Sequence, residues 1–250
     1  MNQNYSPNSR ATRIITKLIW LAPIIIMALL VAACNKISTK VFDTRISEGT
    51  IQYRVTFPEL SDESITATLL PETMTYSFKE DQFASFFEAA GGVFKNKIIA
   101  DRQNKRVDHE LKVFRKQIKV LMNETDVLQM LADYPKMTVI KTSDTDSIAG
   151  FPCKKALVVF EEIDIPEIEV YYTQEINMNK PNWCTQYHEI EGVLMAYEIE
   201  EFGVRMRLEA TSVDDEKVAP EILEPNEDYQ SITKGEMDVE LSQLVETFEL

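Results

Sequence analysis

Apolar and polar residues alternate along several segments after residue 45, and this pattern predicts an antiparallel sheet. In a strand, successive side chains point to opposite faces, so such a segment has one apolar face and one polar face. Two segments show the alternation clearly, 51–57 and 73–78. Their apolar members are Ile51, Tyr53, Val55, Phe57, Met74, Tyr76 and Phe78. Strands with one buried face are typical of antiparallel sheets.

The second half of the chain repeats this alternation. Segments 148–160 and 167–173 are expected to pair, as are 193–199 and 204–210, the latter through a turn at residues 200–203. The inward side chains expected in these strands include Val158, Phe160, Met195, Tyr197, Met206 and Leu208. Further strands are expected at 65–70, 97–100, 106–114, 117–122 and 137–142, a strand with a bulge at 82–94, and a polar turn at 143–147.

Two segments have helical spacing instead. Thr125 is expected to cap a short helix, which Pro135 ends. Residues 233–250 predict a C-terminal amphipathic helix, whose apolar stripe consists of Met237, Leu241, Leu244, Val245 and Phe248. The stripe could pack over the open side of the sheet or bind a partner, and packing is favoured because such a stripe rarely stays bare. The expected fold is mostly β with a few helices.

The first 33 residues have the pattern of a secretory signal. Arg10, Arg13 and Lys17 precede an apolar run at 18–30, and no acidic residue occurs in this part. The run is shorter than the roughly 20 residues that a stable membrane-spanning helix needs. Pro23 would also kink a permanent span. We therefore expect residues 1–33 to be a cleaved leader.

Cys34 follows the small residues Ala32 and Ala33, an arrangement that resembles the lipobox of bacterial lipoproteins. The resemblance implies that Cys34 becomes the lipidated first residue of the mature protein, followed by a tether at 34–45. Acyl chains on this cysteine would hold the protein to a membrane. The tether has no acidic cluster, which favours the periplasmic side of the outer membrane. The alternative is an uncleaved single-span anchor.

The amino-acid composition limits the classes of molecule that the protein is expected to bind. The formal net charge is −15, which disfavours binding to nucleic acid or to anionic lipid headgroups. The acidic surface could attract a cationic partner or divalent ions, but a solvated, self-repelling surface is the simpler interpretation. No second segment after Cys34 is apolar and long enough to span a membrane.

Cys153 and Cys184 are the other two cysteines, and outside the cytoplasm they could form a disulfide. The alternative is two buried or unpaired thiols. The spacing alone does not decide, because pairing requires α-carbons within about 7 Å.

The chain shows no motif of a catalytic centre, a metal site or a cofactor site. His109 lies in a charged segment and is expected to face solvent, and His188 lies in a loop. Neither belongs to a zinc motif, and the sequence has no nucleophile elbow or glycine-rich phosphate loop. We therefore predict a protein that is not an enzyme and has no cofactor.

Several ordered motifs together resemble a family of uncharacterised lipoproteins of Gram-negative bacteria with a domain of unknown function. The motifs are the stretch 46–53, Ile148-x-Gly150-Phe151-x-Cys153-Lys154-Lys155-Ala156, Val170-Tyr171-Tyr172-Thr173, and Glu189-Ile190-x-Gly192-Val193-Leu194-Met195. The resemblance covers residues 46–232. These proteins are similar in pattern to the periplasmic lipoprotein carriers LolA and LolB. That similarity implies a curved antiparallel half-barrel around an apolar cavity, covered by helices.

The sequence thus predicts a lipid-anchored envelope protein that binds a lipid, acyl chain or other apolar ligand in a half-barrel. The expected domains are the leader 1–33, the tether 34–45, the β domain 46–232 and the helix 233–250. Residues expected on the ligand-binding face are Tyr53, Val55, Phe57, Met74, Tyr76, Phe78, Val158, Phe160, Met195, Tyr197, Met206 and Leu208. The alternative is an envelope protein that binds an unidentified protein partner through its acidic surface or C-terminal helix.

Overall fold

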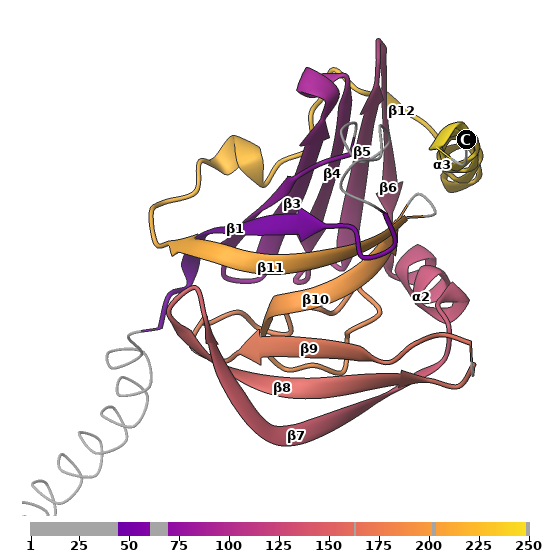
Figure 1. Ribbon diagram of the computed structural model, residues 1–250. Helices are drawn as coiled ribbons and strands as arrows, with labels where there is room; N and C mark the ends of the chain where they lie inside the picture. The colour runs from indigo at the N-terminus through magenta and orange to yellow at the C-terminus, as the bar shows by residue number, and fades with distance from the viewer. Residues whose placement is uncertain (1–44, 61–69, 163, 202–203, 249–250) are drawn as a thin grey trace, which may run out of the picture. The chain divides into compact units, whose positions relative to one another are not determined.

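The computed structural model describes residues 45–60, 70–162, 164–201 and 204–248, with side chains as far as Leu244. Within this part of the chain, one sheet has the strand order β12-β6-β5-β4-β3-β2-β1-β11-β10-β9-β8-β7 (Figure 1). Neighbours are antiparallel, except that β12 runs parallel to β6. The sheet is strongly curved and unclosed, which confirms the predicted half-barrel-like fold.

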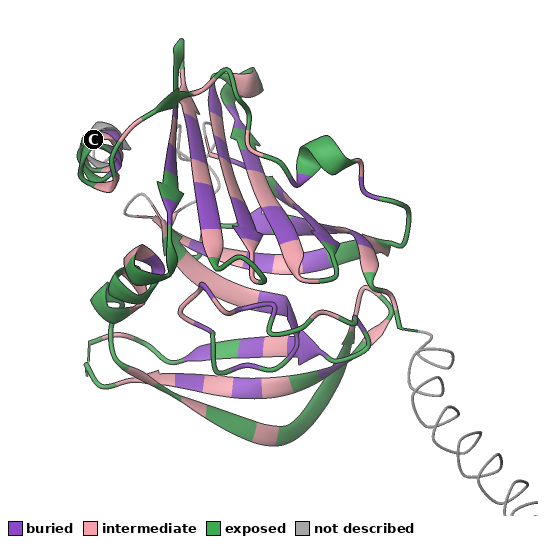
Figure 2. Ribbon diagram, turned by 180° about the vertical axis from the view of Figure 1, so that it is seen from behind, coloured by how far each residue is buried: buried purple, intermediate pink, exposed green. Residues whose placement is uncertain are grey.

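The strands are β1 (Glu48–Thr56), β2 (Thr73–Lys79), β3 (Gln82–Ala89), β4 (Phe94–Asp101), β5 (Arg106–Val113), β6 (Lys116–Met122), β7 (Met137–Ile148), β8 (Phe151–Phe160), β9 (Ile168–Thr173), β10 (Val193–Glu201), β11 (Val204–Asp214) and β12 (Gln230–Ser231). The α-helices are α2 (Glu124–Asp133) and α3 (Lys234–Phe248), and two short 3-10 turns are η2 (Ala90–Gly92) and η3 (Pro220–Ile222). Buried and more exposed residues alternate along the strands, as Figure 2 shows.

The segment 143–147 was predicted as a polar turn, and this prediction is wrong. These residues lie inside β7, where the pairing with β8 shifts register between Lys141 and Thr145. The turn falls instead at Ala149 and Gly150, whose φ angles are 49° and 83°. Positive φ at both central residues is the geometry of a tight hairpin turn, which glycine adopts without steric cost. The polar residues mark an edge strand rather than a loop.

Other element boundaries also differ from the prediction. Gly91 and Gly92 form the 3-10 turn between β3 and β4 rather than a bulge within one strand. The cap of α2 is Asn123, not Thr125: Asn123 Oδ1 accepts hydrogen bonds from the backbone N–H groups of Thr125 and Asp126. Residues 200 and 201, predicted to turn the chain, belong to β10.

Residues 215–229 cross the outer, convex face of the sheet and return the chain to β6. Val218 and Leu223 pack against Ala84 and Ile99 there. Lys119 Nζ donates a hydrogen bond to the backbone oxygen of Asn226 at 2.8 Å. The short strand β12 then pairs with β6, and α3 follows. The final segment therefore leaves the convex face and places α3 beside β6 at that edge (Figure 1).

The leader, the tether with Cys34, and most of the strand predicted at 65–70 lie outside the described residues. In the part of the chain that is described, no helix has the length and apolar character needed to cross a membrane.

Candidate functional site

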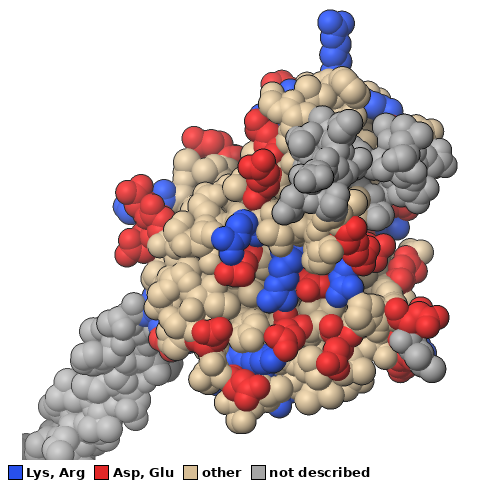
Figure 3. Space-filling model, in the orientation of Figure 1, with Lys and Arg blue, Asp and Glu red and all other residues tan. Residues whose placement is uncertain are grey.

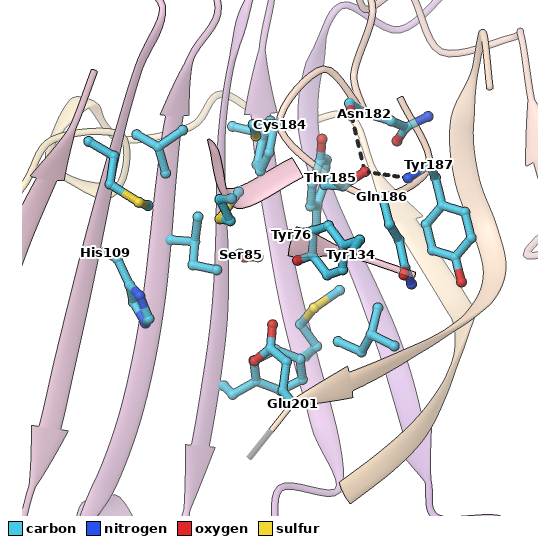
Figure 4. Close-up of a pocket in the computed structure, with 18 of the residues that line it drawn as sticks. Tyr76, Ser85, His109, Tyr134, Asn182, Cys184, Thr185, Gln186, Tyr187 and Glu201 are labelled. Atoms are coloured by element: carbon cyan, nitrogen blue, oxygen red, sulfur yellow. Dashed lines mark hydrogen bonds between the residues drawn. The ribbon is translucent and has the colours of Figure 1, made fainter. Parts of the chain in front are cut away.

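The concave face of the sheet holds a cavity of about 380 Å³. Strands β1 to β6 and β10 form its walls, together with α2, α3 and the loop between β9 and β10. Figure 4 shows the cavity with lining residues from the strands on one side and from the loop on the other. Its volume lies within the range of about 300–1,000 Å³ that is usual for small-molecule sites.

Cross-strand register arranges the floor of the cavity in rows, because residues directly opposite on neighbouring strands share a face. One row consists of Tyr76, Ser85, Ile98, His109 and Val120, which are paired in sequence across β2 to β6. The next row consists of Met74, Phe87, Asn96, Leu111 and Ile118, of which Met74 and Phe87 line the cavity. Each strand thus contributes one side chain to each row. Most members are apolar, so the floor suits an apolar ligand.

The loop between β9 and β10 closes one side and is fixed by a buried amide. Asn182 Nδ2 donates hydrogen bonds to the backbone oxygens of Ile190 at 2.8 Å and Gly192 at 2.9 Å. A Cβ atom on Gly192 would lie only 2.6 Å from the backbone oxygen of Thr173, so this close approach requires glycine. The loop is therefore held against β9 by backbone contacts, and it brings Cys184 and Tyr187 to the cavity.

The two helices cover the remaining side. Met130 and Tyr134 from the α2 region, and Met237 and Leu241 from α3, line the cavity. Met237 and Leu244 are buried in the main core, so the described part of the α3 stripe packs on the sheet as expected. This packing uses the apolar face that the alternative interpretation assigned to a protein partner.

Tyrosine hydroxyl groups in the walls donate to fixed acceptors. Tyr53 Oη donates to the backbone oxygen of Leu194 at 2.7 Å, and Tyr187 Oη donates to that of Glu198. The Tyr53 ring makes edge-to-face contacts with Tyr76 and Tyr197. Burial is the main cause that raises the pKa of Tyr53, Tyr76 and Tyr197, so all three stay neutral around neutral pH. These tyrosines therefore contribute neutral aromatic surface to the cavity walls.

Three polar side chains at the cavity are joined by hydrogen bonds. His109 Nε2 lies 2.6 Å from Asn96 Oδ1, and Asn96 Nδ2 donates to Glu201 Oε2 at 3.3 Å. Because Asn96 Oδ1 can only accept, Nε2 of His109 carries the proton in this arrangement. We call His109, Asn96 and Glu201 the polar triplet. In Figure 4, His109 and Glu201 lie away from the loop residues Asn182 and Cys184.

Burial shifts the two ionisable members of the polar triplet in opposite directions. It lowers the pKa of His109 to about 4, although the charge of Asp238 acts against this shift. It raises the pKa of Glu201 to about 7. Desolvation disfavours the charged form of either group, which explains both directions. At neutral pH the imidazole is neutral and Glu201 is partly protonated.

The prediction that His109 faces solvent is wrong. On β5, His109 alternates with Asp108 and Glu110 and shares the inner face with Val107 and Leu111. Asp108 and Glu110 bind Arg106 and the N–H of Asn226 on the outer side. The charged neighbours suggested a solvated strand, whereas the apolar residues two positions away would have placed His109 inside.

The predicted ligand-face residues are divided between the cavity and the packed core. Tyr53, Met74, Tyr76 and Tyr197 line the cavity. Val55, Phe78, Met195, Met206 and Leu208 are buried in the main core, and Phe57 packs against it. Val158 and Phe160 belong to a second cluster, where Tyr187 and Ile190 of the loop cover β8 and β9. Sequence reasoning missed Ser85, Phe87, Ile98 and the polar triplet.

Cys153 and Cys184 are both buried and free, so the structure corresponds to the unpaired alternative. Burial raises the pKa of the Cys184 thiol to about 12, and it also raises the pKa of Cys153. A thiol with a raised pKa is a poor nucleophile at neutral pH. Both cysteines are therefore packing residues in this structure.

Charged side chains in the part of the chain described include ion pairs on the surface. No group of three or more His, Cys, Asp or Glu residues there has the arrangement of a metal site. On the face shown in Figure 3, acidic side chains lie beside basic ones. Several form ion pairs across the sheet surface, including Arg205 with Glu198 and Lys155 with Glu169.

Comparisons with known proteins give distant likenesses of architecture. No protein-family model and no curated protein matches the chain. Among solved structures, MucB in complex with MucA(peri) shares 10% identity, with a TM-score of 0.31, over 77% of this chain and 59% of that one. The Pseudomonas aeruginosa MucA/MucB complex matches with 10% identity and a TM-score of 0.32, over 76% of this chain and 60% of that one.

A β-barrel-like protein from Brucella abortus with a domain of unknown function, DUF1849, shares 10% identity over 68% of this chain and 98% of its own, with a TM-score of 0.28. The chain spans about three fifths of the length of the MucB chains that it matches. At these identities and TM-scores the likenesses carry no argument about function, and the relation to LolA and LolB stays a prediction.

Proposed function

We propose that this protein is a non-catalytic, lipid-anchored component of the cell envelope that binds an apolar ligand, such as an acyl chain, in its half-barrel. The observation that carries the proposal is the 380 Å³ cavity with a floor of aligned apolar rows. Architecture of this kind is what the resemblance to the lipoprotein carriers implies. The ligand chain would lie between the floor of β2 to β6 and the cover formed by the loop and helices.

Binding strength should follow the length of the buried chain. Each buried methylene contributes about 0.8 kcal/mol, which corresponds to roughly fourfold in the dissociation constant. In a series of primary alcohols, affinity is expected to rise by this factor per methylene until the chain fills the cavity, and then to level off. Titration calorimetry measures the series directly. A series without dependence on length would contradict an enclosed apolar site.

Filling the cavity should abolish binding. Ser85 is a small residue in the floor, between Tyr76 and Ile98 in its row. In a Ser85→Trp variant the indole would occupy the ligand's space, so decanol binding should fall by at least about tenfold. Ser212→Trp is the matched control, because Ser212 is exposed on β11. Equal binding by both variants would place the ligand elsewhere, and circular dichroism checks that both are folded.

The anchor is tested separately from the pocket. Cys34→Ala is expected to move the protein from the membrane fraction to the soluble envelope fraction, because the acyl chains would be lost. Cys153→Ala, which alters a buried thiol in the folded part, should leave the fractionation unchanged. Mass spectrometry of the intact protein should show acyl groups on Cys34 only in the wild type and this control. A Cys34→Ala protein that stays in the membrane would instead support the uncleaved single-span anchor.

A further inference from the structure

Two members of the polar triplet, His109 and Glu201, line the cavity, and the residue that joins them is almost completely buried. Asn96 is 1% exposed and bridges His109 on β5 and Glu201 on β10 through hydrogen bonds of 2.6 Å and 3.3 Å. Both of its partners line the cavity. A buried amide with its donor and acceptor both used fixes the positions of the two groups that it joins. Glu201 is thereby held facing the ligand space, where a ligand's polar head could meet it.

No lysine or arginine of the described residues forms an ion pair with Glu201. Among the described residues of the lining, Lys234 is the single lysine or arginine, and its Nζ lies 3.1 Å from Asp238 Oδ2. Glu200 and Asp238 are the other carboxylates of the lining. The described part of the lining therefore carries more negative than positive charge, and Glu201, its most buried carboxylate, forms no ion pair with a described lysine or arginine.

This arrangement discriminates between ligand head groups by charge. An anionic head would be repelled by the carboxylates and would find Lys234 already engaged. A neutral hydroxyl group could form an ordinary hydrogen bond. A protonated amine would form a charge-assisted hydrogen bond with Glu201, and such bonds are roughly twice as strong as neutral ones. Burial in the folded protein removes much of the hydration of the Glu201 carboxylate. The ammonium group of the ligand would replace part of the lost hydrogen bonds to water.

We propose that the polar triplet selects apolar ligands whose chain ends in a protonated amine, in preference to the same chain with a neutral or an anionic head. The inference rests on the apolar-ligand function proposed above and names the class of ligand for that site. Glu201 binds the ammonium group, Asn96 orients the carboxylate, and the rows of the floor hold the chain. His109 positions Asn96 and stays uncharged.

The selection should depend on pH through Glu201. The titratable or charged groups that line the same cavity include Tyr134 at the end of α2, Tyr197 and Glu200 from β10, His109 from β5, and Lys234 and Asp238 from α3. Burial raises the pKa of Tyr134 to about 12 and that of Tyr197 further, so neither changes charge between pH 5 and 8. Alkyl amines also stay protonated there, as lysine does. The preference for an amine should therefore grow as pH rises through the pKa of Glu201.

The experiment compares decylamine, decanol and decanoate, which share one chain length, by titration calorimetry on the full chain in 150 mM salt. At pH 8 decylamine is expected to bind roughly tenfold or more tightly than decanol, and decanoate more weakly than either. At pH 5.5 the advantage of decylamine over decanol should fall below about threefold. If decanol does not bind, the proposed function itself fails. If decanol binds and decylamine is no tighter, only the head-group selection is overturned.

Two variants locate the effect. Glu201→Gln should remove the preference for decylamine and its dependence on pH, while decanol binding stays within about twofold. Glu72→Gln removes the same formal charge from an exposed residue outside the cavity lining and should retain the preference. Equal losses in both variants would assign the preference to the general negative charge and overturn the inference. So would decylamine binding by the cavity-filled Ser85→Trp variant, because the amine would then bind outside the pocket.

Discussion

A Phe78→Ala variant is expected to lose about 3–5 kcal/mol of its free energy of unfolding. Phe78 on β2 is 0% exposed and lies in the main core, next to the ring of Tyr76 and opposite Phe83 on β3. Removing a fully buried ring deletes its contacts and leaves a cavity that the surrounding strands cannot close. Since whole domains are stable by about 5–15 kcal/mol, this variant loses a large share of the total. Urea unfolding, followed by circular dichroism, measures the difference.

Phe114→Ala is the matched control for this prediction. Phe114 lies in the turn between β5 and β6 and is 74% exposed, so its removal should change the free energy of unfolding by less than about 0.5 kcal/mol. Decanol binding by the folded fraction of Phe78→Ala should remain, because Phe78 does not line the pocket. A loss near that of the control would contradict the assignment of Phe78 to the packed core.

The contrast between Phe78 and Tyr76 shows what the alternation pattern can predict. Both residues lie on the same face of β2, and the pattern correctly placed both inside. It could not tell that Tyr76 lines an open cavity while Phe78 is packed, because both positions have the same periodicity. That difference depends on how far the loop and the helices stand from each row, and this distance is set by tertiary contacts such as those of Asn182.

The polar triplet could not be predicted from the sequence, for a related reason. Its members come from three strands, and the contacts that join them span 13 and 105 residues of chain. Only the cross-strand register brings them together. For His109 alone a signal existed, since Val107 and Leu111 lie two positions to either side. Asp108 and Glu110, which flank His109, point to the opposite face of the sheet, and their charge suggested a solvent-exposed strand.

Edges and turns were predicted least well. The residues of 143–147 have the composition of a loop, but they form an edge strand, where polar side chains protect the unpaired side from other strands. The shorter strands between residues 94 and 122 were placed almost correctly, since their turns carry clear polar signals. Local composition thus located the strands, whereas the position of a strand in the sheet decided how polar it could be.

The polar triplet should also give the stability of the protein an unusual dependence on pH. Glu201 has a pKa raised from 4.5 to about 7, so its contribution is fully present below pH 4.5 and is lost as pH rises through 7. His109 has a pKa lowered from 6.5 to about 4, so its contribution is present above pH 6.5 and is lost as pH falls through 4. Between about pH 4.5 and 6.5 the two slopes oppose each other, and in the wild type they largely cancel.

Single substitutions should separate these two slopes. Relative to the wild type, His109→Gln is expected to lose stability as pH rises from 4 to 6.5, the range over which His109 titrates. Glu201→Gln is expected to gain stability as pH rises from 4.5 to 7, the range over which Glu201 titrates. Each difference should reach the order of 2–3 kcal/mol, because one pKa unit corresponds to about 1.4 kcal/mol. Urea unfolding at intervals of half a pH unit measures both, and the comparison with the wild type removes the contribution of the other carboxylates. The double variant should follow the wild-type profile closely. Two single variants with parallel profiles would show that His109 and Glu201 do not lie together in a desolvated pocket, and the head-group selection would then lose its structural basis.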